Sequence, residues 1–217
     1  MDKKERCEQL AAAFFEKHPE LVGAQNDIMR AAGALVEMYE KNGQLLVCGN
    51  GGSSADADHI VGELMKGFML RRPLALQEQQ KFGQAFGNEG ARIAAALQQG
   101  LPAISLGAHA ALISAFANDV DPGLVYAQQV YGYGRKQDVL VGISTSGNAQ
   151  NVVAALKTAR VKEMVSIGLT GRDGGAFKEL CDICIVAPAE ETYRIQEHHI
   201  VIYHFLCTYV EAYFFDR

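Results

Sequence analysis

The sequence of 217 residues lacks an apolar run of about 18 residues, the length that a membrane-spanning helix needs. Its first residues, MDKKER, do not have the pattern of a secretory signal peptide. Basic residues are fewer than acidic ones, 20 Lys and Arg against 25 Asp and Glu, and they form no cluster. Because a nucleic-acid backbone attracts a basic face, we expect neither a membrane nor a nucleic acid as partner.

Cysteines are few, odd in number and irregularly spaced, at positions 7, 48, 181, 184 and 207. Such thiols are typical of reduced cytoplasmic proteins, so we expect a cytoplasmic location. Cys181 and Cys184 have the C-x-x-C spacing of zinc and redox sites, but they lie in an apolar run typical of a strand. Residues three apart on a strand point to opposite faces, so we expect structural thiols here.

Five short aliphatic runs are typical of buried strands, and helical patterns separate them. The runs cover residues 44–48, 102–106, 138–143, 164–169 and 183–187. Strands that alternate with helices predict a five-stranded parallel α/β sheet. The nearly continuous apolar character of each run predicts that helices flank both faces of this sheet.

Three further segments complete a single predicted domain that covers residues 1–217. Residues 1–43 predict two leading helices, with Pro19 suited to a helix start and Gly43 to a helix end. Residues 69–101 have mixed polarity and predict a lid or an insertion. Residues 192–215 contain no helix breaker and predict a long C-terminal helix. Because this helix is apolar around most of its circumference, we expect a neighbouring chain to cover one side of it.

Two predicted strands end in small polar residues that precede a helix, in CGNGGSSAD (48–56) and in GISTSGNAQ (142–150). The free N–H groups of a helix N-terminus attract phosphate, and glycines and hydroxyls suit its close approach. Ordinary helix caps use the same residue types. Two such loops at one edge of a parallel sheet nevertheless favour a phosphate site. The P-loop spacing and its lysine are absent, and no nucleotide cofactor is implied.

Candidate acid–base residues lie on two predicted helices. His59 and Glu63 are four residues apart and share one helix face, where they can bind a metal or act as an acid–base pair. A surface ion pair is the ordinary alternative for this spacing. The last helix has histidines at 198, 199 and 204, and spacing alone does not choose among them.

Together these segments resemble the sugar isomerase (SIS) domain family, most closely its phosphoheptose isomerases. The resemblance rests on four motifs in the family's order: CGNGGSSADADHIVGEL, GISTSGNAQNV, GLTGRDGG and RIQEHHIVIYH. It implies a flavodoxin-like fold, a homotetramer, catalysis by Glu63 and His204, and zinc bound by His59, Glu63, Gln196 and His204. The residues that it implies for substrate binding are Asn50, Gly51, Gly52, Ser53, Asn118, Asp119, Ser144, Thr145, Ser146 and Gln196.

The sequence departs from the family pattern at two places near the expected substrate. Lys66 and Gly67 stand where the family usually has Gly-Arg, so an arginine is missing unless Lys66, Arg71 or Arg72 replaces it. Ala149 stands where the family often has a serine. Both departures leave the identity of the sugar open.

The resemblance implies an aldose–ketose isomerase that converts sedoheptulose 7-phosphate to D-glycero-D-manno-heptose 7-phosphate through an enediol. Glu63 would be the base on carbon and His204 the acid–base partner at the oxygens. Because these residues lie on helices far apart in the sequence, we expect the site to form between subunits. Two alternatives stay open: an isomerase of a different phosphosugar, and a non-catalytic SIS module that binds a sugar phosphate or a protein, as in a replication-initiation factor.

Overall fold

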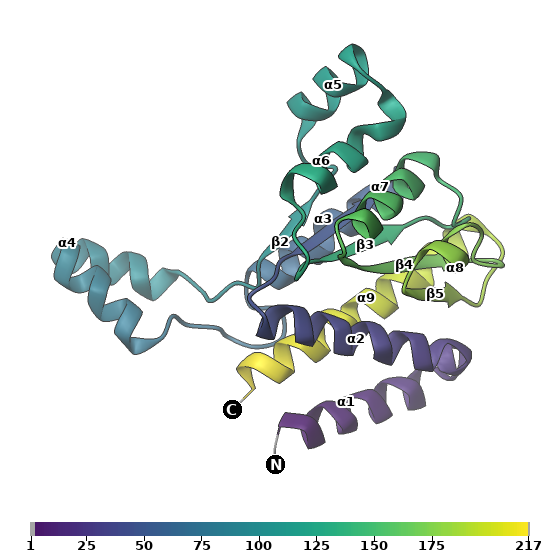
Figure 1. The fold of residues 1–217 in the computed structure, drawn as a ribbon. Helices are drawn as coiled ribbons and strands as arrows, with labels where there is room; N and C mark the ends of the chain where they lie inside the picture. The colour runs from purple at the N-terminus through teal and green to yellow at the C-terminus, as the bar shows by residue number, and fades with distance from the viewer. Residues whose placement is uncertain (1–2, 217) are drawn as a thin grey trace.

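The computed structural model describes residues 3–216, and its centre is a five-stranded parallel sheet (Figure 1). Its order is β2-β1-β3-β4-β5, so β1 and β3 are neighbours and Gly49 pairs with Ile143 at their ends. Each strand lies within two residues of a predicted run, and the parallel α/β prediction is confirmed. The strands are β1 (Leu45–Gly49), β2 (Ala103–Ser105), β3 (Val139–Ile143), β4 (Val165–Gly171) and β5 (Ile183–Ala187).

Helices cover both faces of the sheet, as the apolar runs predicted. Alternate strand residues point to opposite faces, so Val47 joins one buried cluster and Leu46 the other. The first face carries α2 (Gln25–Glu40), α3 (Gly52–Met65) and α9 (Thr192–Phe215), and the second carries α5 (Ala110–Asp119), α6 (Val125–Tyr133), α7 (Gln150–Val161) and α8 (Phe177–Leu180). The 3-10 turns η1 (Pro19–Ala24) and η2 (Pro122–Leu124) precede α2 and α6.

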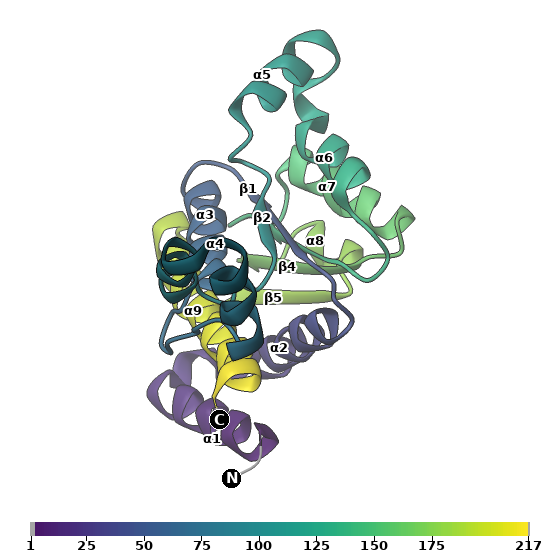
Figure 2. The same cartoon turned by 90° about the vertical axis from the view of Figure 1, so that its left-hand side faces the viewer.

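The long helix α9 is covered over most of its length by its own chain, and the expected cover by a neighbouring chain stays a prediction. It packs against β4, β5, α2 and α3, and α1 (Lys3–Lys17) lies on its other side (Figure 2). The rings of Phe14 on α1 and Phe205 on α9 stack with their centroids 4.2 Å apart. Among the residues described, α9 included, no helix has both the length and the apolar character needed to cross a membrane.

Residues 69–101 contain α4 (Leu76–Ala96), which stands away from the sheet as an arm (Figure 1). Its two helical segments meet at Gly87, where a φ of 57° breaks the helix. The segments then pack so closely that a Cβ on Gly90 would lie 1.9 Å from the carbonyl oxygen of Phe82. Leu76 and Phe86 are exposed on the arm. The interpretation of this segment as a lid or an insertion stays a prediction.

Cys181 lies outside the strand on which it was predicted. β5 begins at Ile183, and Cys181 follows directly after α8. Cys181 and Cys184 pack against the same buried cluster, so the argument that they point to opposite faces is wrong. Burial raises the pKa of both thiols, to about 11 for Cys184.

His199 on α9 is expected to make folding stability sensitive to mild acid. Its side chain is fully buried, and its Nε2 donates to the carbonyl oxygen of Thr170 on β4 at 3.1 Å. Burial lowers the pKa of His199 to about 4, whereas an unfolded histidine has a pKa of about 6.5. The unfolded chain therefore binds the proton first, and stability falls as the pH drops from about 6.5 to about 4.

This loss amounts to about 2 kcal/mol between about pH 7 and pH 5. Urea unfolding at both pH values measures it. We expect His199→Gln to weaken the pH dependence, with the half-buried His198→Gln as control. Equal pH dependence in the two variants would contradict the assignment.

Candidate active site

The two hydroxyl-bearing loops lie side by side at the carboxyl edge of the sheet. Asn50, after β1, exchanges two side-chain hydrogen bonds of 2.8 and 2.9 Å with Asn151 at the start of α7. Gly51 has a φ of 56°, which lets the chain turn sharply from β1 into α3. Ser53 and Ser144 are buried beside this link, while the side chains of Thr145 and Ser146 are half-buried. The structure thus brings the two predicted phosphate loops to one place.

A third loop, GRDGG at residues 171–175, closes against the second one. Gly147 has a φ of 65°, and a Cβ there would lie 2.0 Å from the carbonyl oxygen of Gly174. A hollow of about 340 Å³ beside Ser146 is also lined by Asn148, Arg172, Asp173 and Glu190. Sequence reasoning did not single out Arg172, which adds a cation to this hollow.

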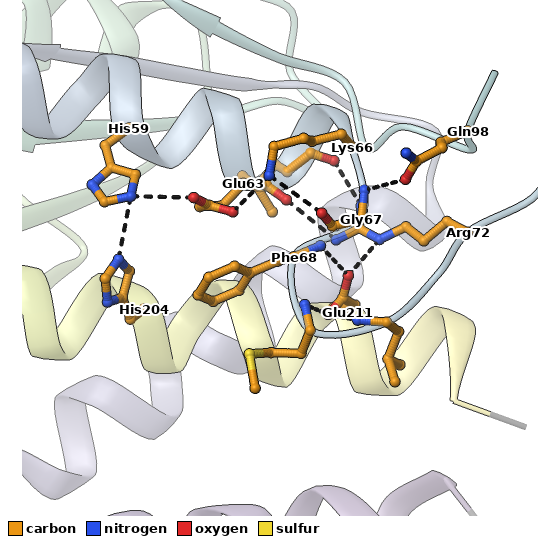
Figure 3. A network of polar contacts seen from close by, with 12 residues as sticks. His59, Glu63, Lys66, Gly67, Phe68, Arg72, Gln98, His204 and Glu211 are labelled. Carbon is orange, nitrogen blue, oxygen red and sulfur yellow. Dashed lines mark hydrogen bonds and ion pairs between the residues drawn. The ribbon is translucent and has the colours of Figure 1, made fainter. Parts of the chain in front are cut away.

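Three candidate acid–base residues meet where α3 packs against α9 (Figure 3). His59 Nε2 lies 3.2 Å from Glu63 Oε1 and 3.4 Å from His204 Nε2. A single chain therefore assembles this cluster. A second subunit is not needed to bring Glu63 and His204 together, because both helices pack on the same face of the sheet. The expectation that the complete site forms between subunits stays a prediction.

Glu63 is largely buried and pairs with a cation. Its side chain is only 14% exposed, and Lys66 Nζ donates to Oε2 at 3.2 Å. Burial and the neighbouring His59 lower the pKa of His204, so its imidazole is neutral near pH 7 and can accept a proton. Glu63 thus supplies a carboxylate and His204 a neutral imidazole, two groups that can transfer protons.

Gln196 reaches the first loop, whereas Asn118 and Asp119 are not linked to the rest of the candidate site. A Cβ on Gly52 would lie 2.4 Å from Gln196 Nε2, so the side chain of Gln196 rests directly on that glycine. Asn118 and Asp119 end α5, which packs on α6 and η2, and they bond to each other at 2.8 Å. Within residues 3–216, no hydrogen bond joins either one to another candidate site residue.

Two residues that sequence reasoning did not single out contact the acid–base cluster. The hydroxyl of Tyr203 lies 3.2 Å from Asp56 Oδ1 and 2.9 Å from His59 Nδ1. Asp56 precedes His59 by three positions and therefore shares its helix face. That spacing was the available signal, but Tyr203 gave none, because its partners lie on another helix.

The residues implied to bind zinc have suitable donor atoms. The separations of 3.2 and 3.4 Å in the cluster resemble those between neighbouring ligands of a tetrahedral zinc with bonds of about 2.0–2.1 Å. As placed, however, the described residues contain no group of three or more His, Cys, Asp or Glu that could hold a metal ion. The donor types therefore fit the metal, while the side-chain arrangement does not surround one.

A buried ion pair fixes the chain directly after α3. Arg72 Nε donates to Glu211 Oε1 at 2.7 Å, and both side chains are almost fully buried (Figure 3). Arg72 also donates to the carbonyl oxygens of Leu64 and Glu63, at 2.8 and 3.3 Å. Because its guanidinium is committed to these partners, Arg72 does not replace the missing family arginine. Glu211 further accepts hydrogen bonds from the backbone N–H groups of Phe68, Met69 and Leu70.

The chain is similar in sequence to proteins of a known family. Residues 20–99 and 88–171 match the model of the SIS domain. A phosphoheptose isomerase from Helicobacter pylori is 39% identical over 194 residues, which cover 89% of this chain and 88% of that protein. The chain therefore belongs to the SIS domain family.

Two solved structures narrow the comparison to one branch of this family. A phosphoheptose isomerase from Neisseria gonorrhoeae has a TM-score of 0.70 and 33% identity, covering 94% of this chain and 97% of its own. One from Francisella tularensis has a TM-score of 0.73 and 29% identity, covering 97% and 98%. The resemblance to the phosphoheptose isomerases predicted from the sequence is confirmed.

Removal of only one partner of the Arg72–Glu211 ion pair is expected to destabilise the fold. Arg72→Met leaves the Glu211 carboxylate buried without its counter-ion and should lower the free energy of unfolding by about 3–5 kcal/mol. Arg72→Met combined with Glu211→Leu should recover much of this loss, because no unpaired charge remains. Urea denaturation of both variants measures the difference. A double variant as unstable as the single one would contradict this account.

Proposed function

We propose that this protein is an aldose–ketose isomerase that converts sedoheptulose 7-phosphate to D-glycero-D-manno-heptose 7-phosphate. The observation that carries the proposal is the cluster of His59, Glu63 and His204 on the same chain as two adjoining hydroxyl-bearing loops. Its relatives from three bacteria, named as phosphoheptose isomerases, support the same substrate.

The proposed reaction moves one proton between neighbouring carbons. Glu63 removes a proton from carbon 1 of the ketose, and the electron pair forms the enediol as the carbonyl oxygen at carbon 2 gains a proton. Return of a proton to carbon 2, with loss of the proton on oxygen 1, gives the aldose. His204, neutral and half-buried beside the base, transfers the proton between the two oxygens.

Zinc remains part of the proposal through the family resemblance. His59, Glu63, Gln196 and His204 would hold it after small side-chain adjustments, and it would polarise the sugar carbonyl. No nucleotide cofactor is proposed.

The phosphate of the substrate is proposed to bind at the two loops. Ser53, Ser144, Thr145 and Ser146 supply hydroxyl donors there, together with the N–H groups that begin α3 and α7. Asn50, Gly51, Gly52 and Gln196 border this place, while Asn118 and Asp119 would join it only by a different packing of α5. This proposal assigns the sugar's anionic end to the sheet edge and its carbonyl end to the acid–base cluster.

Ser146→Ala is expected to raise KM about 10-fold while kcat changes little. A phosphate contact is made equally in the ground state and the transition state, so its loss weakens binding without slowing the chemical step. Steady-state kinetics separate the two parameters, with the exposed Thr192→Ala as control. A fall in kcat at unchanged KM would contradict the assignment.

A homotetramer in the cytoplasm is proposed as the working form. An apolar groove of about 660 Å³ next to His204 is lined mainly by side chains of α1 and α9, and Met69 on its rim is 66% exposed. A second copy of the chain is a suitable cover for such a surface. Light scattering at micromolar concentration tests this, and a monomer with full activity would contradict it.

Glu63→Gln should reduce kcat by about 10²–10⁴-fold, because the amide cannot accept the proton from carbon. His204→Gln should be similarly severe, while His198→Gln on the same helix should be mild. The zinc content of the same purified samples, measured by mass spectrometry, should fall in the first two variants only. Full turnover by folded Glu63→Gln would point to another base or to a non-catalytic SIS module.

A different phosphosugar is the second candidate substrate. It is favoured by Lys66, which pairs with Glu63 where the family usually has Gly-Arg, and by the commitment of Arg72 to Glu211. Assay of several ketose phosphates distinguishes the two, since the preferred substrate has the highest kcat/KM.

A further inference from the structure

The hydroxyl of Tyr203 lies between two polar partners from α3. It is 3.2 Å from Asp56 Oδ1 and 2.9 Å from His59 Nδ1. Tyr203 itself is 2% exposed and belongs to the core that α9 shares with the sheet. This packing holds the hydroxyl in place, because the ring has no room to turn away.

The donor and acceptor atoms of these side chains fix the direction of both contacts. A tyrosine hydroxyl has one proton to donate, and an ionised carboxylate can only accept. Tyr203 therefore donates to Asp56 Oδ1, and its oxygen accepts from His59 Nδ1–H. The other ring nitrogen, Nε2, then faces the candidate active site.

His59 Nε2 contacts both candidate catalytic residues. His59 Nε2 lies 3.2 Å from Glu63 Oε1 and 3.4 Å from His204 Nε2. The ring of Tyr203 also packs edge-on against both imidazoles, with centroids 5.4 Å from His59 and 5.0 Å from His204. The ring of Tyr203 thus packs against His59, and its hydroxyl forms a hydrogen bond with the same residue.

We infer that Tyr203, supported by Asp56, is a positioning residue that fixes the ring orientation of His59, with Nδ1–H toward Tyr203 and Nε2 toward Glu63 and His204. Its role in turnover rests on the proposed isomerase function. Histidines whose second nitrogen bonds to an outer acceptor keep their first nitrogen available to a ligand or a neighbouring group. Without the Tyr203 hydroxyl, the His59 ring would be free to rotate, which would move Nε2 away from Glu63 and His204.

The direct test is Tyr203→Phe, which removes only the hydroxyl and keeps the packed ring. We expect kcat for the phosphosugar to fall about 10–100-fold, the usual effect of losing such an outer hydrogen bond. KM should change little, because the phosphate loops are untouched. The matched control is Tyr39→Phe, which removes another buried hydroxyl, bonded to the carbonyl oxygen of Pro102 at 3.2 Å, in the same core. Its kcat should stay that of the wild type.

Histidine side-chain ¹⁵N NMR supplies a readout that needs no substrate. The His59 signals, identified by their loss in His59→Gln, should show a protonated Nδ1 in the wild type and in the control Tyr39→Phe. Tyr203→Phe should shift them toward the Nε2–H form or a mixture. Unchanged His59 signals together with unchanged kcat in Tyr203→Phe would overturn the inference.

Two further outcomes are separated by the same experiment. A wild-type protein that isomerises no phosphosugar but shows the expected His59 Nδ1–H refutes the proposed function and leaves the positioning role standing. If Tyr203→Phe does not fold, Asp56→Asn takes its place, because Asp56 is only half-buried on α3. Loss of the Nδ1–H signal in Asp56→Asn supports the inference, and an unchanged signal and kcat contradict it.

Discussion

The packing of α9 against α3 is the contact on which the candidate active site depends. It joins a helix that follows the first strand to one that follows the last, and it sets His204 Nε2 3.4 Å from His59 Nε2. The apolar side chains of both helices share one buried cluster with the sheet, including Ile60 on α3 and Ile202 on α9. Polar side chains of both helices also meet at this contact, where the side chain of His59 is 40% exposed.

The same contact is secured further along by a buried charge pair. Glu211 on α9 binds Arg72 and three backbone N–H groups directly after α3, so the segment that leads into the α4 arm is tied to the last helix. Arg72 in turn binds the carbonyl oxygen of Glu63. A buried ion pair such as this one fixes the positions of the segments that it joins. It adds little net stability, because desolvation of the two charges offsets much of their attraction. Arg72 therefore holds the backbone of Glu63, the proposed base, while the carboxylate of Glu63 faces His59.

The strands and the phosphate-type loops could be predicted from the sequence because each depends on local pattern. Continuous aliphatic runs identified β1 to β5, and parallel order placed the loops after β1 and β3 at one edge. The family resemblance selected His204 among three histidines, which spacing could not do. The burial of Arg72 and the contact between Tyr203 and His59 depend on residues more than 100 positions apart, and no local pattern reports them. The cover of α9 by α1 was missed for the same reason.

The central claim is that this chain isomerises a phosphosugar by proton transfer through an enediol. The most direct measurement follows sedoheptulose 7-phosphate by NMR in D₂O with the purified protein. The account predicts an aldose 7-phosphate that carries deuterium at carbon 2, because a proton held on Glu63 exchanges with solvent. A ketose phosphate that stays unchanged, with neither aldose nor deuterium incorporation, would contradict it.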